Sequence, residues 1–406
     1  MSTVTLSPAP RRLRAGLALV GILVAGANLR ASITTVGPLL DRVRDDLDLS
    51  STTASALISL PVLCFGVFSP VAPAVARRLG LEPAITLALS VLCVGVVARS
   101  VPWVPALWIG TALLGLGIAF VNVLLPAVVR RDFPHAVGRL TGTYSVAQSA
   151  LAALGAGLAV PIAGLSDHGW RLAFGVWAGL ALLGVAVFLP QLRGAAVRRA
   201  DAAGDAAATA DAVDVPHRLP WRSMLAWQVT LFMGLQSMVY YTLIGWWPSI
   251  EESHGVTSST AGAHMSVLQV ASIAGNILTG WVVQRWSRDQ RLLLAGLSTL
   301  YLVAVSGELA APGLGLLWSA VAGVGGGGLI VLALALFGLR TRHHEQAAAL
   351  SGMAQSCGYL IAAAGPIVVG AVHDATSDWT VPLVILIAVL VGQLVAGLGA
   401  CRHRYL

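Results

Sequence analysis

Long apolar runs, separated by short polar segments, follow one another along the whole chain. A helix needs about 20 apolar residues to cross the hydrocarbon core of a bilayer. The third, sixth and ninth runs are apolar on nearly every side, as expected of lipid-facing helices, whereas the first, fifth, seventh, eighth and eleventh carry polar residues in mid-run. The pattern predicts twelve transmembrane helices, at 13–40, 52–76, 83–99, 105–129, 137–164, 170–190, 223–250, 260–284, 291–309, 314–339, 346–372 and 379–401.

The arginines alternate between the two sets of segments that connect these spans. One set, together with both ends of the chain, contains 20 of the 25 basic residues, all of which are arginine. The other set contains only Arg42, Arg44, Arg99 and Arg171, together with most of the acids. Because basic residues are retained on the cytoplasmic side, this split predicts that both termini are cytoplasmic in a multi-pass inner-membrane protein.

Residues 191–222 interrupt the regular series of spans. The segment is rich in Ala, Asp and Arg and has no apolar face of spanning length. We therefore expect a flexible cytoplasmic linker at 191–222, between a six-helix bundle at 1–190 and a second at 223–406.

The two halves repeat each other in sequence. Ser50-Ser-Thr-Thr-Ala54 in the first half matches Thr257-Ser-Ser-Thr-Ala261 in the second. Pro38 matches Pro248 at an offset of 210 residues. Parallel six-helix repeats are the internal symmetry of major facilitator carriers, whose substrate site lies between the halves near the middle of the membrane. The fold class predicted is an all-α polytopic membrane protein of two pseudo-symmetric six-helix bundles.

Composition excludes several other classes of protein. The chain is 57% hydrophobic and only 11% charged, far below the quarter expected of a soluble domain. Its net charge of +7 is spread between apolar runs, so no basic face for nucleic acid is expected. The four cysteines lack metal-ligand spacing, and no span contains a nucleophile–base pair or a metal cluster. We expect no enzyme activity, cofactor or metal, and a monomer in contact with lipid and a small-molecule substrate.

Four segments resemble the cyanate and 2-nitroimidazole porter family, and the resemblance runs from about residue 16 to the C-terminus. It implies a cyanate-like or nitroheterocycle-like substrate. The segments are Asn28-Leu-Arg30…Val36-Gly-Pro38-Leu-Leu, Asn122-Val-Leu-Leu-Pro126-Ala…Arg131-Asp132-Phe133-Pro134, Trp227-Gln228-Val-Thr-Leu-Phe-Met-Gly-Leu-Gln236-Ser237 and Leu350-Ser-Gly-Met-Ala-Gln355-Ser…Gly358-Tyr359.

One loop departs from the superfamily pattern. The loop after the second span of such carriers contains an acid and bases that latch the outward-open state. Here the loop retains Arg77 and Arg78 but lacks the acid, and the matching loop of the second half, with Arg285, lacks it too. These three arginines are candidates for a cytoplasmic gate whose partner the sequence does not reveal.

Arg30 is the strongest candidate for a substrate ligand. It lies well inside the first span, where a charge is costly unless it faces a cavity or a partner. No acid in the first, fourth, fifth, seventh or eighth span is available to neutralise it. An unpaired guanidinium in a cavity suits an anion or a strongly polar solute. The alternative is a structural arginine that bonds to backbone carbonyls and amide side chains.

Other polar residues recur at helical spacing in the spans expected to line a cavity. On a continuous first helix, Asn28 would lie opposite Arg30, so only one of the two would face the solute. For each residue the alternative is a hydrogen bond that joins helices. The substrate-binding candidates are Arg30, Asn28, Tyr144, Gln148, Gln236, Tyr240, Gln355 and Tyr359.

Coupling to an ion is left open by the sequence. His264 lies near the outer end of the eighth span and is a candidate for proton coupling, or else a solvated structural histidine. Glu308 is expected at the membrane interface, which leaves no acid in a cavity-lining span. Trp246 and Trp247 are expected in an interfacial aromatic belt.

Taken together, these residues favour a secondary active or facilitative carrier of a small polar or anionic solute that works by alternating access. One alternative is a broad-specificity drug-type exporter, although the unpaired positive charge of Arg30 argues against cationic drugs as its substrates. The other is a transport-inactive receptor.

Overall fold

The computed structural model describes residues 11–166, 169–206, 220–286 and 289–406. Over these ranges the chain is built of helices, which confirms the predicted all-α class. Ten helical segments are long and apolar enough to cross a membrane. Two more spans pack among them and complete the predicted twelve: one is formed by α8 (Val137–Gly157) with α9 (Ala159–Ala163), and the other by α12 (Met224–Ser253). These two are less apolar than the ten because they carry many of the polar side chains described below.

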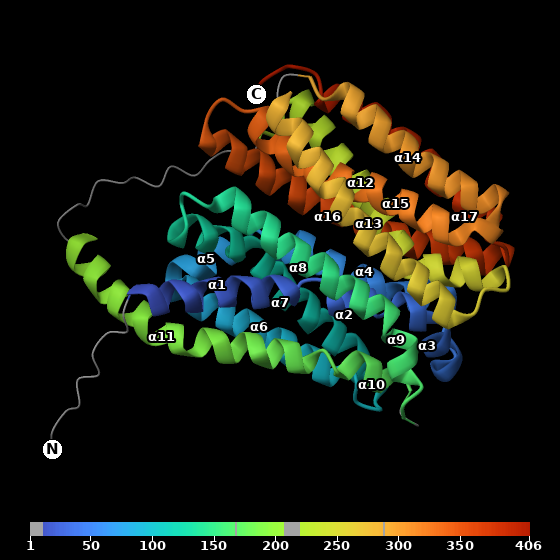
Figure 1. Cartoon of the computed structure of the whole chain (residues 1–406), viewed down its shortest axis with the longest axis horizontal. Helices are drawn as coiled ribbons and strands as arrows, with labels where there is room; N and C mark the ends of the chain where they lie inside the picture. Colours follow the sequence, from blue (N-terminus) through green and yellow to red (C-terminus); the bar gives the residue numbers. More distant parts are fainter. Residues whose placement is uncertain (1–10, 167–168, 207–219, 287–288) are drawn as a thin grey trace.

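The N-terminal half forms one bundle, drawn from blue to green in the lower part of Figure 1. Its elements are α1 (Arg11–Ala27), α2 (Ala31–Thr34), the 3-10 turn η1 (Gly37–Leu39), α3 (Leu40–Leu47), α4 (Ser51–Phe68), α5 (Ala72–Leu79), α6 (Leu81–Ala98), α7 (Val104–Asp132), α8 (Val137–Gly157), α9 (Ala159–Ala163), α10 (Trp170–Gly175) and α11 (Ala178–Ala206).

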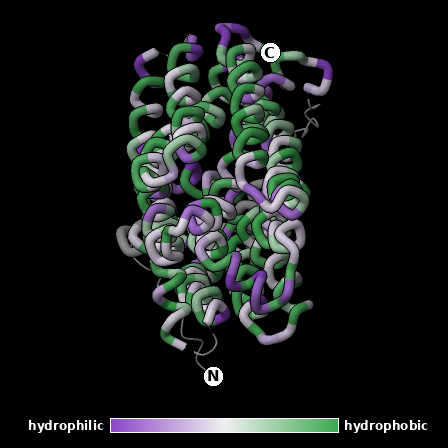
Figure 2. Tube along the Cα trace, turned by 90° about the vertical axis from the view of Figure 1, so that its right-hand side faces the viewer, coloured by the Kyte–Doolittle hydropathy of each residue, from purple (hydrophilic) through white to green (hydrophobic). Residues whose placement is uncertain are grey.

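The C-terminal half forms the second bundle, above the first in Figure 1. It contains α12 (Met224–Ser253), α13 (Ser258–Arg285), α14 (Arg291–Ala310), η2 (Pro312–Leu314), α15 (Gly315–Leu339), α16 (His344–Thr376) and α17 (Thr380–Ala400). Hydrophobic positions cover most of both bundles, with hydrophilic ones in short patches (Figure 2).

The segment expected to be a linker is partly helical, because α11 continues to Ala206. Residues 207–219 lie outside the described residues. Below, the end of the molecule at which α1 begins and α17 ends is called the terminal end, and the opposite end is called the distal end.

The sequence repeat marks equivalent helix starts in the two halves. The Ser50 hydroxyl accepts a hydrogen bond from the Thr53 amide and caps α4. Thr257 caps α13 through the Thr260 amide in the same way. Side-chain caps of this kind satisfy one of the backbone N–H groups that a helix start leaves unpaired. The repeated Ser/Thr motif therefore sets the distal start of the second and eighth spans.

The glycine run at Gly325–Gly328 is a packing surface. A Cβ at Gly327 would meet the backbone of Ser272 on α13, and one at Gly325 would meet Tyr301 on α14. Small residues let membrane helices approach closely enough for backbone-to-backbone contact. The run thus holds α15 tightly between α13 and α14.

Candidate substrate cavity

A cavity of about 1080 Å³ lies between the two bundles. Helices of both halves line it, chiefly α7 and α8 from the first, and α12, α13 and α16 from the second. Its lining extends to Pro73, Gln284 and Ala348, near helix ends at the terminal end of the molecule. The cavity is therefore open toward the terminal end.

The distal end is closed by direct contacts between the bundles. Asp374, at the end of α16, accepts hydrogen bonds from the Ser51 and Thr52 amides at 2.8 Å and from the Thr52 hydroxyl at 2.6 Å. On the other side of the interface, the Ser266 hydroxyl of α13 donates to the Ala153 carbonyl of α8 at 2.7 Å. Asp374 thus caps α4 from the opposite bundle, and this helix start is a natural position for a negative charge.

The first span breaks where the candidate cation lies. Helix α1 ends at Ala27, residues 28–30 form a turn, and α2 starts at Ala31. The expectation of a continuous helix over 13–40 is therefore wrong in this part. Asn28 and Arg30 still point to different sides, and Arg30 alone lines the cavity. The break carries Arg30 to the cavity wall.

Asn28 does not line the cavity. It is 3% exposed, and its amide nitrogen donates to the Val24 carbonyl at 2.8 Å and to the Leu180 carbonyl of α11 at 3.1 Å. These bonds join the end of α1 to α11. The geometry supports the alternative role for Asn28, a hydrogen bond between helices.

Three tyrosines surround the Arg30 guanidinium. Its central carbon lies 4.7 Å from the ring centre of Tyr240 and 5.6 Å from that of Tyr241, both on α12. Tyr359 of α16 is the third ionisable neighbour. Aromatic faces attract a cation through their quadrupole without neutralising its charge. Arg30 is therefore held in place across the bundle interface while its positive charge remains.

No carboxylate of the described residues forms an ion pair with Arg30. One of its terminal nitrogens, Nη1, is buried and has no hydrogen-bond partner among them. A buried donor left without a partner is costly, more so when it is charged. Arg30 is thus a donor suited to an acceptor that enters from the cavity.

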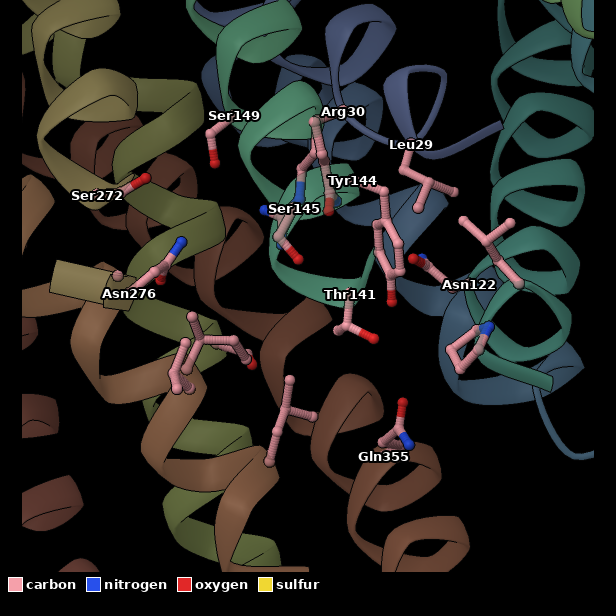
Figure 3. A pocket seen from close by; sticks show the side chains of 18 of the residues that line it. Leu29, Arg30, Asn122, Thr141, Tyr144, Ser145, Ser149, Ser272, Asn276 and Gln355 are labelled. Carbon is pink, nitrogen blue, oxygen red and sulfur yellow. The ribbon is translucent and has the colours of Figure 1, made fainter. Parts of the chain in front are cut away.

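Amide and hydroxyl groups complete the cavity wall. Thr141, Tyr144 and Ser145 of α8 line the cavity together with Asn276 of α13 (Figure 3). The Tyr240 hydroxyl donates to Gln269 Oε1 at 3.2 Å, and Gln269 Nε2 is buried without a partner. The wall therefore presents both donors and acceptors to a solute.

The predicted glutamines also line this cavity. Gln355 Nε2 donates to the Ser351 hydroxyl at 2.8 Å on α16, and Gln236 Nε2 donates to the Ser237 hydroxyl at 2.7 Å on α12. Of the eight predicted substrate ligands, the seven that line the cavity are Arg30, Tyr144, Gln148, Gln236, Tyr240, Gln355 and Tyr359.

Several lining residues were missed or misread in the sequence. Tyr241, Gln269 and Asn276 were not among the candidates, although each lies in a span expected to face the cavity. Asn122, which the sequence analysis names only as part of a family segment, also lines the cavity (Figure 3). The signal available was a polar residue in mid-span. The sequence does not say which side of the helix it occupies.

The candidate gate arginines lie at the terminal end. Arg77 and Arg78 are exposed in the last turn of α5, four and five residues after the lining residue Pro73. Arg285 is exposed beside Gln284 at the end of α13, with its guanidinium 5.8 Å from the Trp281 ring centre. Since the cavity is open at this end, their role in closing it stays a prediction.

Two tryptophans differ from expectation, and one acid is buried with them. Trp246 and Trp247 are completely buried, so the aromatic-belt interpretation is wrong. The Trp246 indole donates to the Pro366 carbonyl at 3.2 Å, linking α12 to α16. Glu308, near the end of α14, is also completely buried and is covered by other helices. Tertiary packing inside the C-terminal bundle covers all three.

Comparisons with known proteins agree with this architecture. The family model described as Major Facilitator Superfamily matches residues 22–307 and 229–400. The chain belongs to the major facilitator superfamily. The 2-nitroimidazole transporter of Escherichia coli (strain K12) is 40% identical over 386 residues, which cover 95% of each chain. The cyanate transport protein CynX of the same organism is 25% identical over 95% of this chain and 98% of its own.

A solved structure shares the fold. An inward-facing, occupied bacterial homologue of the human lysosomal transporter Spinster has a TM-score of 0.73 and 14% identity, over 97% of both chains. The family and the fold together make this protein a membrane transporter of small solutes and not an enzyme, as the sequence predicted. The resemblance to cyanate and 2-nitroimidazole porters is confirmed.

Proposed function

We propose that this carrier moves a small anionic or polar solute of the cyanate or nitroheterocycle type by alternating access, with Arg30 as the principal ligand. The observation that supports this most is the buried Arg30 Nη1, which has no partner among the described residues and no carboxylate to neutralise it. Cyanate and a nitro group both present electronegative acceptors that a guanidinium can bind. Relatives named for these two solutes align with 95% of this chain and with 95% or more of their own length.

The tyrosines and amides would set the shape of the bound solute. Tyr240 and Tyr241 pack their rings against each other with centroids 5.3 Å apart, beside the guanidinium. A flat aromatic solute can stack near such rings, whereas a bulky cationic drug would meet the positive charge of Arg30. The charge in the cavity therefore favours the small-solute function over a cationic-drug exporter.

The side of the membrane follows from the arginine distribution. If both termini are cytoplasmic, as the positive-inside rule predicts, the cavity opens to the cytoplasm and the closed distal end faces outward. This conformation would be the inward-open state of a monomer in the inner membrane. The opposite state requires the Asp374 contacts to separate while the arginine-rich loops of the terminal end approach each other.

The test is solute affinity in purified Arg30 variants. Arg30→Gln should lose the charge-assisted hydrogen bond, worth about 1.5–3 kcal/mol or roughly ten- to a hundredfold in affinity. Arg30→Lys should retain the charge but lose the forked donor geometry, and bind with intermediate affinity. Binding of 2-nitroimidazole and of cyanate is measured on monodisperse protein, so that folding losses do not enter the result.

Arg99 provides the matched control. It is 1% exposed, donates from Nη2 to the Ser32 carbonyl at 2.8 Å and lies over the Phe174 ring at 4.5 Å, away from the cavity. Arg99→Gln should lower thermal stability and leave affinity unchanged in the folded fraction. Wild-type affinity in Arg30→Gln would refute the proposed role of Arg30, and with it the preference for an anionic solute.

A further inference from the structure

A second polar cluster lies inside the C-terminal bundle, toward its distal end. His264 Nδ1 on α13 lies 3.0 and 3.1 Å from the two carboxylate oxygens of Glu251 on α12. The Trp247 indole donates to Glu251 Oε1 at 3.2 Å and to the Ser319 hydroxyl of α15 at 2.8 Å. None of these residues lines the central cavity.

Glu308 of α14 adds a second carboxyl group to the cluster. Glu308 and Glu251 are both completely buried. Neither oxygen of Glu308 has a hydrogen-bond partner among the described residues. The two carboxyl groups lie close enough to repel each other when both are ionised. An ionised carboxylate without partners is very costly to bury, so Glu308 is expected to hold a proton.

The packing around the cluster offers little else that could compensate the charge. The helices α15 and α17 and the turn η2 contain no ionisable residue. The charged neighbour on α12 is Glu252, which interacts with Asp41 and Arg42 of α3. His264 is therefore the nearest group able to carry positive charge, and it does so only when it is protonated.

The fold leaves room for the Glu251 carboxylate in particular. Residue 315, the first of α15, is glycine, and a Cβ there would overlap Glu251 Oε1. The side chain of His264 is 16% exposed, whereas that of Glu251 is fully covered. One side of the imidazole is thus exposed and another contacts the buried carboxylate, the arrangement of a proton relay.

We propose that Glu251, His264 and Glu308 form a proton-binding site, separate from the solute cavity, through which transport is coupled to protons. A proton arriving at the exposed side of His264 is taken up by the imidazole, which gives its Nδ1 proton to a Glu251 oxygen. Release reverses these transfers, and the net change is one proton bound or lost. Glu308 stays neutral and keeps the cluster from accumulating a second negative charge.

The same two helices connect this cluster to the solute cavity. Helix α12 carries Tyr240 in the cavity and Glu251 in the cluster, and α13 carries Gln269 in the cavity and His264 in the cluster. The hydrogen bond from Tyr240 to Gln269 and the contact of His264 with Glu251 both span the α12–α13 interface. A change in the protonation of Glu251 or His264 therefore acts on the same α12–α13 interface that positions Tyr240 beside Arg30.

The first experiment measures proton binding without any solute. Infrared difference spectra of the purified carrier, taken between acidic and alkaline buffer, should contain a band from a buried protonated carboxyl. Glu251→Gln should remove this band, because Glu251 is the acid that gains and loses the proton. Glu308→Gln should retain a band, because an acid that is neutral at both pH values does not contribute to the difference spectrum. Glu252→Gln, which removes an acid one residue along α12, should also leave the Glu251 band in place. Wild-type spectra without any buried carboxyl band would overturn the proposal, whether or not the variants fold.

The second experiment separates coupling from solute binding. In proteoliposomes, Glu251→Gln should lower the rate of 2-nitroimidazole uptake driven by a pH gradient at least tenfold. Exchange of labelled for unlabelled 2-nitroimidazole, which needs no gradient, should continue. Gradient-driven uptake that persists in Glu251→Gln would refute proton coupling through this cluster. If 2-nitroimidazole is not transported at all, the proposed solute fails, and the infrared bands still decide the proton site.

Discussion

Two of the lining glutamines differ in how much of their hydrogen-bonding capacity is left for a solute. Gln355 is partly exposed to the cavity, and its amide nitrogen is bonded to one hydroxyl of its own helix. Gln236 is 1% exposed, and its amide nitrogen bonds to Ser237 and to the Met233 carbonyl. The carbonyl oxygen of Gln355 is therefore the more available of the two for a ligand.

The residue-scale prediction concerns these glutamines. Gln355→Ala should weaken the affinity for 2-nitroimidazole by about three- to tenfold, the worth of one neutral hydrogen bond. Gln236→Ala should have a smaller effect. Gln393→Ala is the matched control, because Gln393 is fully buried and bonded to Ser298, away from the cavity. If Gln355→Ala and Gln236→Ala bind 2-nitroimidazole as tightly as Gln393→Ala does, neither of these two lining glutamines is a solute ligand and both serve in packing.

At the scale of elements, the first span is decisive because it is interrupted twice. The turn at residues 28–30 presents Arg30, and the 3-10 turn η1 brings Gly37 against α12. A Cβ at Gly37 would overlap the Ile244 carbonyl oxygen, which belongs to rigid helix backbone. Close approach of η1 to α12 at the distal end therefore requires glycine at this position.

Gly37→Ala should keep the distal end from closing. Because the obstructing atom is backbone, the bundles must separate to accommodate the methyl group, and the population should shift toward a distally open state. The measurement is the distribution of distances between spin labels on the distal ends of α4 and α16. Gly296→Ala, in α14 with open space around the added Cβ, should leave that distribution unchanged. If Gly37→Ala has the wild-type distance distribution, the turn η1 shifts to accommodate the methyl group and the predicted effect on closure is wrong.

The whole molecule is a pair of bundles whose relative position sets the direction of access. The Asp374 carboxylate holds them together at the distal end by three hydrogen bonds to the start of α4. Beside it, His373 lies 3.2 Å from the Ser51 hydroxyl and stacks on Trp379 at 4.1 Å between ring centres. The contacts of Asp374 and His373 with α4 cross between the bundles and exist only when the distal end is shut, so they stabilise this state alone.

Asp374→Asn should weaken the closed distal end. The substitution retains one acceptor but loses the charge at the start of α4, a loss of about 1 kcal/mol or around fivefold in the ratio of the two states. Spin-label distances across the distal end measure the ratio. Asp378→Asn, in the turn that follows α16, is the control, because Asp378 bonds to Thr380 of its own bundle. If the control also shifts the ratio fivefold, the effect comes from the general negative charge of this region and not from the Asp374 contacts.

The orientation of the molecule in the membrane is a further prediction at this scale. Because 20 of the 25 arginines belong to the terminal end or its loops, alkaline phosphatase fused after residue 205 should be inactive in cells. A fusion after Gly255, in the distal loop between α12 and α13, should be active. Activity in the first fusion and inactivity in the second would invert the topology and make the cavity outward-open.

Hydrophobicity and its period determined the architecture from the sequence alone. Twelve apolar segments and the repeat between halves are local properties, since a bilayer requires each span to satisfy its own backbone hydrogen bonds within one helix. Arg30 could also be singled out locally, because a charge within a span is costly wherever its side chain points. These features were predictable without knowledge of which helix packs on which.

Only the tertiary structure decided which polar residues face the solute and which acids are buried. The sequence could place Asn28 and Arg30 on different sides of the first span, but only the packing shows that Asn28 meets α11 and Arg30 lines the cavity. Glu251 and Glu308 lie near helix ends, where a sequence pattern indicates water, but neighbouring helices cover both. Burial depends on contacts between segments far apart in the chain, and the free energy of those contacts is not contained in any one segment.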